Sequence, residues 1–143
     1  MYKHILVPLD QSDLAEQALP HALAIAQAMH AEVTLVAVVD VLDEETMRAA
    51  GAAMDWEGEI ESLGVYLRAL CSRLGEADVR CHWEVLKGDV AEQVLEHAEG
   101  QDTDLIVMAT HGRTGLARWV HGSVADQIVA ETPVPIMLVR VEE

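Results

Sequence analysis

Short apolar runs recur along the chain, and a segment with a helical pattern separates each run from the next. The runs are rich in Val, Ile and Leu at consecutive positions, so both faces of each expected strand would be buried. Strands of this kind form a parallel sheet with helices on both faces, and right-handed crossovers make the sheet doubly wound. We expect strands at 4–9, 32–39, 79–86, 104–110 and 134–141, and helices at 14–30, 59–75, 90–99 and 123–132.

Residues at the helix ends support this α/β reading. Ser12 precedes the first helix and can cap it, and Pro20 inside that helix predicts a kink. Asp89, with Glu92 three residues later, forms a capping-box pattern that opens the helix at 90–99. Residues 40–58 are acidic and rich in Ala and Met, and two alternatives stay open there: a helix or a mobile flap.

The length and the charge limit the possible functions. A chain of 143 residues suits one domain, spanning 1–143. A formal net charge of -16 repels phosphates, so we expect neither nucleic-acid binding nor attraction to an anionic membrane. No stretch of 18 apolar residues predicts membrane insertion, and the first residues lack a signal-peptide pattern. Cys71 and Cys81 form no CxxC pair, so we expect a cytoplasmic protein with reduced thiols.

Residues 105–125 contain no Asp or Glu, although the chain has 25 acidic residues. Gly112, Gly115 and Gly122 punctuate this segment, and Ser123 follows at the expected start of a helix. A helix N-terminus attracts phosphate through its free N–H groups, and glycines let the backbone approach an anion closely. The segment is therefore either a phosphate-binding loop or a plain turn with a helix-capping serine.

The position of this segment favours a ligand. It follows the fourth expected strand, and "PLD" at 8–10 follows the first. In open α/β sheets, ligands bind beyond the carboxyl ends of the strands, where the strand order reverses. Arg113 and Arg118 add positive charge to the segment, and a carboxylate there would repel an anionic ligand.

Four stretches of the chain carry a resemblance to a known family: "ILVPLDQS", "VVDV", "MATHGRTGLARWVHGSVAD" and "TPVPIMLV". Across essentially its full length, the chain resembles the universal stress protein (UspA-like) family. The ATP-binding branch of that family carries Gly-x2-Gly-x9-Gly-Ser/Thr. Gly112, Gly122 and Ser123 match its last three elements, and Ala109 replaces the first glycine.

The resemblance implies an adenine nucleotide alpha hydrolase-like fold, a five-stranded parallel sheet of order 3-2-1-4-5. It implies an adenine pocket beside the first strand, and an Asp10 that faces the ribose or the metal-bound phosphates, with Mg or Mn. The loop and the helix start would hold the ribose and phosphates. The candidate nucleotide-binding residues are Pro8, Leu9, Asp10, Val38, Met108, Ala109, Gly112, Arg113, Gly115, Gly122, Ser123 and Val124.

Two functions stay open. The retained Gly112, Gly122 and Ser123 favour an ATP-binding regulatory protein of the stress response, with ATP or another adenine nucleotide as the ligand. The alternative is a nucleotide-independent, dimeric interaction or signalling protein. Catalysis is at most a slow ATPase activity, because Asp10 is the only plausible metal-linked carboxylate and no base would orient a water.

Other families with similar topology lack their required residues here. A response-regulator receiver needs a lysine at the end of the last strand, where this chain has "LVRVEE". No GxxxxGK[ST] motif is present, and "PLDQSD" after the first strand has no glycine for a dinucleotide fingerprint. The seven histidines show no metal-ligand spacing.

The last expected strand, 134–141, predicts self-association. In the family's strand order it lies at a sheet edge, where a long apolar strand risks aggregation unless a partner covers it. Pro133 and Pro135 interrupt only its start, and its first charged residue is Arg140. We expect a homodimer through this strand under two-fold symmetry, beside a protein partner that the sequence does not identify.

Overall fold

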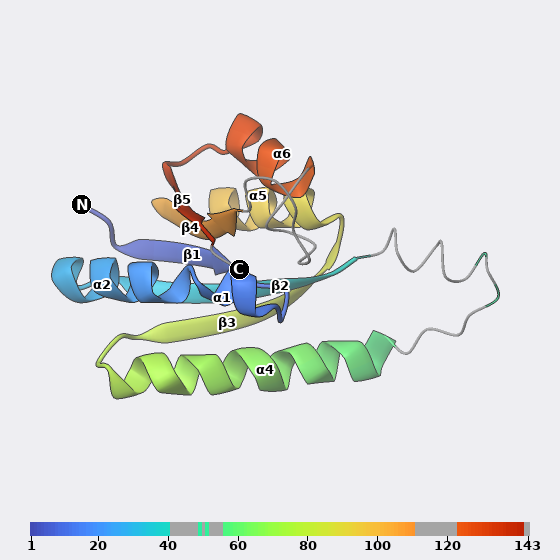
Figure 1. Cartoon of the computed structure of the whole chain (residues 1–143), viewed down its shortest axis with the longest axis horizontal. Helices are drawn as coiled ribbons and strands as arrows, with labels where there is room; N and C mark the ends of the chain where they lie inside the picture. The colour runs from blue at the N-terminus through green and yellow to red at the C-terminus, as the bar shows by residue number, and fades with distance from the viewer. Residues whose placement is uncertain (41–48, 50, 52–55, 111–122, 142–143) are drawn as a thin grey trace.

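The computed structural model describes residues 1–40, 49, 51, 56–110 and 123–141. Within these residues, a five-stranded parallel sheet of order β3-β2-β1-β4-β5 lies between two layers of helices (Figure 1). The fold class and the strand order inferred from the sequence are therefore confirmed. The strands are β1 (His4–Pro8), β2 (Glu32–Asp40), β3 (Cys81–Gly88), β4 (Leu105–Thr110) and β5 (Ile136–Arg140).

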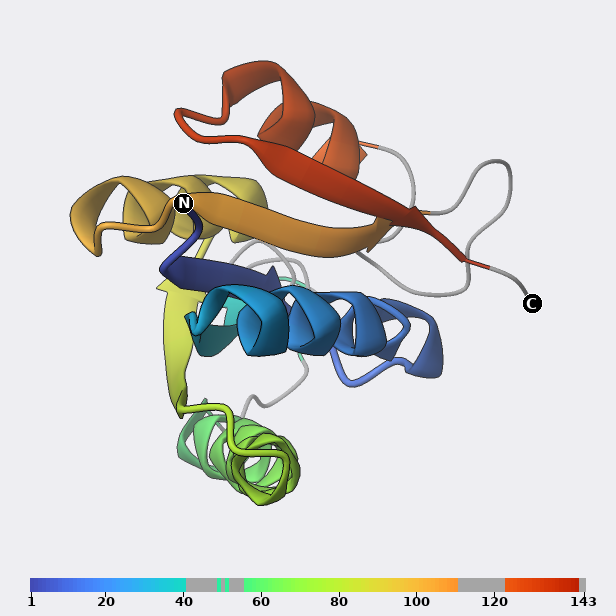
Figure 2. The ribbon, with the colours of Figure 1, turned by 90° about the vertical axis from the view of Figure 1, so that its left-hand side faces the viewer.

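Helices cover both faces of the sheet, as Figure 2 shows from the side. One layer holds α1 (Asp13–Glu16), α2 (Leu19–Met29) and α4 (Trp56–Glu76). The other layer holds α5 (Val90–Gly100) and α6 (Ser123–Glu131). No helix of the described ranges is long and apolar enough to cross a bilayer.

The sheet separates two hydrophobic cores, because successive side chains of a strand point to opposite faces. In β1, Ile5 and Val7 join the core under α1, α2 and α4, whereas Leu6 joins the core under α5 and α6. All three side chains are at most 1% exposed. The expectation that strands buried on both faces build this sheet is therefore confirmed for its centre.

The edge strand β3 departs from that expectation. It begins at Cys81, two residues later than predicted, and its side chains from His82 to Glu84 are exposed. Trp83 is 41% exposed, although its ring lies against Gly64 of α4. An edge strand has a neighbour on only one side, so the helical layers cover it incompletely.

The predicted single helix over 14–30 is wrong, because the chain forms two helices there. The first, α1, ends at Glu16, and α2 begins at Leu19 with Pro20 in its first turn. A proline inside a continuous helix would lack an N–H group and would clash with the carbonyl four residues earlier, which belongs to Glu16. Because α2 begins at Leu19, Pro20 lies in its first turn, where no N–H group needs a partner in the helix and no carbonyl of α2 lies four residues earlier.

Two predicted helix caps are confirmed. The Ser12 hydroxyl accepts a hydrogen bond from the Ala15 N–H at 3.0 Å. A carboxylate oxygen of Asp89 accepts one from the Glu92 N–H at 3.1 Å at the start of α5. The open question about 40–58 falls mostly on 41–48, 50 and 52–55, which lie outside the described residues, but α4 already begins at Trp56.

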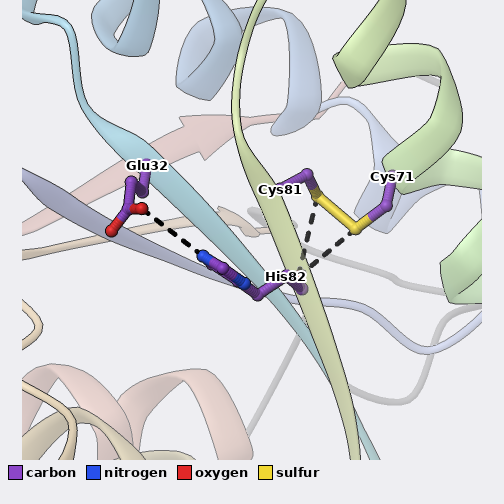
Figure 3. The surroundings of a disulfide bond; sticks show 4 residues. All are labelled: Glu32, Cys71, Cys81 and His82. Atoms are coloured by element: carbon purple, nitrogen blue, oxygen red, sulfur yellow. Dashed lines mark hydrogen bonds and ion pairs between the residues drawn. A yellow bond between two sulfur atoms is a disulfide. The ribbon is translucent and has the colours of Figure 1, made fainter.

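The expectation of two reduced cysteines is wrong in this structure, because a disulfide joins Cys71 and Cys81 (Figure 3). Cys71 lies on α4 and Cys81 is the first residue of β3. Their Cα atoms are 5.2 Å apart, within the range of disulfides. The spacing of ten residues resembles no cysteine motif, and only the packing of α4 on β3 brings the two side chains together.

Leu67 tests the importance of the core under α4. Its side chain is 0% exposed, whereas Val65 on the same helix is 53% exposed. We expect Leu67→Ala to lower the free energy of unfolding by about 2–5 kcal/mol, because it leaves a cavity among buried side chains. Val65→Ala, the matched control, should change it by less than about 1 kcal/mol. Equal losses in urea unfolding of both variants would contradict the assignment of this core.

Candidate functional site

The strand order of the sheet reverses between β1 and β4. The pairing of β1 with β2 runs from His4 to Pro8, but its pairing with β4 covers only Ile5 with Leu105 and Leu6 with Ile106. Both strands continue beyond that point, to Pro8 and Thr110. The two strands therefore part at their carboxyl ends, which is where open α/β sheets bind ligands.

Asp10 follows β1 at this reversal point and is held by two hydrogen bonds. Its Oδ1 atom accepts from the Ser12 N–H at 2.9 Å and from the Ser12 hydroxyl at 2.5 Å. Gln11 between them has a φ of 70°, which lets the chain turn back within one residue. Because Ser12 also caps α1, the carboxylate of Asp10 is fixed relative to both β1 and α1.

Tyr66 of α4 approaches the same region. Its hydroxyl donates to Glu16 Oε2 at 2.6 Å, which ties α4 to α1. Burial raises the pKa of Tyr66 above its usual value, and the carboxylates of Glu16, Asp10 and Asp13 raise it further. The hydroxyl therefore stays protonated and donates its hydrogen bond across the physiological pH range.

Sequence reasoning missed Tyr66 and Glu16. The two residues are fifty positions apart, and neither belongs to a motif. The contact arises only because α4 and α1 lie in the same helical layer (Figure 1). Glu16 is the last residue of the short α1 helix, so the contact also stabilises the helix that Ser12 caps.

The apolar candidate residues divide between the two cores. Val38 and Met108, which are 6% and 2% exposed, belong to the core under α5 and α6. Leu9 and Ala109, 0% and 2% exposed, belong to the core under α1, α2 and α4. The Leu9 N–H donates to the Val36 carbonyl at 2.8 Å, so the backbone of Leu9 extends the hydrogen bonding between β1 and β2. Pro8 ends β1 and is buried.

The described part of the phosphate-binding segment is the start of α6. Ser123 is the first residue of this helix and is exposed, and Val124 packs partly against the core under α5 and α6. Free N–H groups and the positive end of the helix dipole lie at such a start. Residues 111–122 lie outside the described residues, and they include Gly112, Arg113, Gly115, Arg118 and Gly122.

The described residues hold no ready-made metal centre. In those ranges, no three His, Cys, Asp or Glu side chains are grouped so that they could hold a metal ion. A divalent ion at Asp10 would therefore need further ligands from elsewhere, and the phosphate oxygens of a nucleotide are such ligands.

Comparison with known proteins identifies the family. The model of the universal stress protein family matches residues 1–140. The chain belongs to the universal stress protein family. A universal stress protein of Methanocaldococcus jannaschii is 37% identical to this family member over 98% of this chain and 83% of its own length.

Solved structures of universal stress proteins share the fold. UspA of Lactobacillus plantarum has 25% identity and a TM-score of 0.76, over 97% of this chain and 98% of its own. A universal stress protein in complex with cAMP has a TM-score of 0.72 at 20% identity, over 99% and 98% of the two chains. One from Archaeoglobus fulgidus in complex with dAMP has a TM-score of 0.69 at 19% identity, with the same coverage.

The Tyr66–Glu16 contact gives a testable coupling. We expect Tyr66→Phe and Glu16→Ala to interact in a double-mutant cycle by about 1 kcal/mol, because the hydroxyl donates to a charged group that is partly exposed. Tyr66→Phe combined with Glu76→Ala, at the far end of α4, is the control and should give a coupling near zero.

The same contact has a pH signature. Because the folded-state pKa of Tyr66 is raised, its stability contribution is fully present below the unfolded pKa of about 10 and is lost as the pH rises further. Between roughly pH 9 and 11, the parent should therefore lose more stability than Tyr66→Phe. Identical pH dependence in the two proteins would show that the tyrosine titrates normally.

Proposed function

We propose that this universal stress protein binds an adenine nucleotide, ATP in particular, at the carboxyl ends of β1 and β4, and acts as a cytoplasmic regulatory protein of the stress response. The observation that carries the proposal is the parting of β1 from β4 beside an Asp10 carboxylate that Ser12 holds in place. Adenine nucleotides in two structures of the same fold, one with cAMP and one with dAMP, support it.

The donor groups at the reversal point suit a nucleotide. The start of α6 offers N–H groups and the Ser123 hydroxyl to phosphate oxygens. On the strand side, Val38 and Met108 are apolar residues next to the carboxyl ends of β2 and β4, where an adenine ring would pack. Asp10 then faces the ribose or the metal-bound phosphates.

The charge of the chain supports a role for a divalent cation. A triphosphate near Asp10 meets like charge in a chain with a formal net charge of -16. Bound Mg²⁺ or Mn²⁺ neutralises part of the phosphate charge and accepts carboxylate and phosphate oxygens as ligands. Nucleotide affinity should therefore fall when the metal is chelated.

We propose binding rather than rapid turnover. Asp10 already accepts two hydrogen bonds from Ser12, so it is a positioned ligand rather than a general base. Any ATP hydrolysis should be slow. The bound nucleotide acts as a signal that changes the affinity of the protein for its partners.

An association surface at β5 supports the second candidate function, a dimeric interaction protein. This edge strand leaves Met137 37% exposed and Leu138 42% exposed, and the two side chains alternate between the faces of the sheet. Pairing of residues 134–141 with the same strand of a second copy would satisfy the edge and cover both side chains. Such a homodimer is compatible with nucleotide binding between β1 and β4, because β5 pairs with the opposite edge of β4.

The nucleotide proposal is tested by isothermal titration with MgATP. The parent protein should bind, and Gly122→Val should not, because a branched side chain at the helix start would occupy the phosphate position. The matched control is Gly100→Val at the end of α5, where an added Cβ meets no atom within 4 Å. Gly100→Val should bind MgATP like the parent. If Gly122→Val also binds like the parent, the glycine-rich segment is a plain turn and not a phosphate-binding loop.

Ser123→Ala should weaken MgATP binding less than Gly122→Val does. It removes one hydrogen bond to a charged group, which corresponds to about 1.5–3 kcal/mol, and leaves the backbone N–H groups accessible. A titration in which Ser123→Ala abolishes binding while Gly122→Val retains it would contradict these roles.

The dimer proposal is tested by light scattering. Met137→Asp should give monomers that still bind nucleotide but unfold at lower temperature, because a charge at the centre of β5 opposes strand pairing. Val65→Asp on α4, which packs against β2 and β3 near the opposite edge of the sheet, is the control and should stay dimeric. A monomeric parent protein at micromolar concentration would refute the proposal.

A further inference from the structure

The disulfide lies far from the proposed nucleotide site, at the opposite end of the strands. Cys81 begins β3 and pairs in register with Val33, near the start of β2. Its partner Cys71 lies on α4, five residues before the helix ends at Glu76. The bond therefore fastens the exposed edge strand of the sheet to the helix that covers it (Figure 3).

The same backbone arrangement also suits the two thiols in their reduced form. The carbonyl oxygen of His82 lies 3.3 Å from Cys71 Sγ and 3.6 Å from Cys81 Sγ. A thiol is a weak donor, so in the reduced protein either cysteine has an acceptor at hand, whereas the disulfide has no S–H to donate. Both side chains are partly buried against the core under α4. A hydrogen-bond acceptor for the reduced thiols is therefore already in place on β3.

Proximity of the two thiols favours the reaction. The cationic neighbours of Cys81 in sequence point to the other face of β3, because successive side chains of a strand alternate. Arg80 and His82 both pair with Glu32, at 3.1 Å and 3.5 Å, and Figure 3 shows His82 directed toward Glu32 and away from the sulfur atoms. The packing of α4 on β3 therefore brings the two cysteines together, without a contribution from these two charges.

We propose that Cys71 and Cys81 form a reversible dithiol–disulfide site that is oxidised by hydrogen peroxide and reduced by a small dithiol. One thiolate attacks the O–O bond, forms a sulfenic acid and releases hydroxide, which takes up a proton to become water. The second thiol attacks the sulfenic sulfur, forms the S–S bond and releases another water. The two cysteines lose two electrons and two protons, and one peroxide is reduced to two waters.

Oxidation should stabilise the β3 edge without changing the nucleotide site. The bond closes a short loop between the end of α4 and the start of β3, and closing a loop of this length lowers the entropy of the unfolded chain. Because this loop lies at the amino end of β3, the carboxyl ends of β1 and β4 are not involved. MgATP affinity should therefore be the same in both redox forms.

The reaction is tested by intact-mass measurement after alkylation. The protein is reduced with dithiothreitol, freed of the reductant, treated with equimolar hydrogen peroxide and then exposed to iodoacetamide under native conditions. Before peroxide both cysteines should be alkylated. After peroxide neither should be, the mass should fall by two hydrogen atoms, and fresh dithiothreitol should restore both thiols without denaturant.

Cys71→Ser and Cys81→Ser are the matched controls. Each keeps one thiol, so peroxide should add oxygen atoms to it or link two molecules, and no loss of two hydrogens within one chain should occur. Comparison of the two redox forms of the parent should give a rise of roughly 5–10 °C in the unfolding midpoint on oxidation. The same treatment should leave the midpoint of Cys71→Ser unchanged.

Three results would overturn the proposal. The first is that the thiols of the parent can still be alkylated after peroxide treatment. The second is that they form disulfides only between molecules. The third is that the native disulfide resists dithiothreitol and opens only in denaturant, which would make it a permanent crosslink rather than a reversible site.

Discussion

The structure depends on the hydrogen bonding of β1 along both of its edges. The chain forms β2 and β3 on one side of this strand and then returns to form β4 and β5 on the other. Because Ile5, Leu6 and Val7 are buried on the two faces, β1 cannot shift by one residue without moving its apolar side chains to the wrong core. Its fixed register determines where the chain emerges at Asp10.

The candidate site follows from that constraint. The β1–β4 pairing ends before either strand does, so the carboxyl ends part next to the residues that lead into α1 and α6. Ser12 links the end of β1 to α1, since its hydroxyl caps α1 and also donates to the Asp10 carboxylate. The Tyr66–Glu16 hydrogen bond anchors α1 to α4, so the position of Asp10 depends on a helix that belongs to a distant part of the sequence.

The sequence predicted the features that depend on local pattern. The apolar runs predicted the strands because burial on both faces leaves a continuous signal, and Ser12 and Asp89 predicted caps because a cap involves residues only three apart. The errors came from contacts between distant elements. The Cys71–Cys81 bond requires α4 to pack on β3, and the exposure of Trp83 requires β3 to be an edge. Pro20 shows a local error as well, because a kink and a new helix are two ways to avoid the same clash.

The central claim is that an adenine nucleotide binds where β1 and β4 part. Amide chemical-shift mapping of the labelled protein during titration with MgATP tests it most directly, because it reports the location of the ligand. The account predicts the largest shifts at the amides of Asp10, Ser12, Thr110 and Ser123, with little change at Cys71 or Trp83. Shifts concentrated on α4 and β3, or saturating amounts of MgATP without any shift, would contradict it.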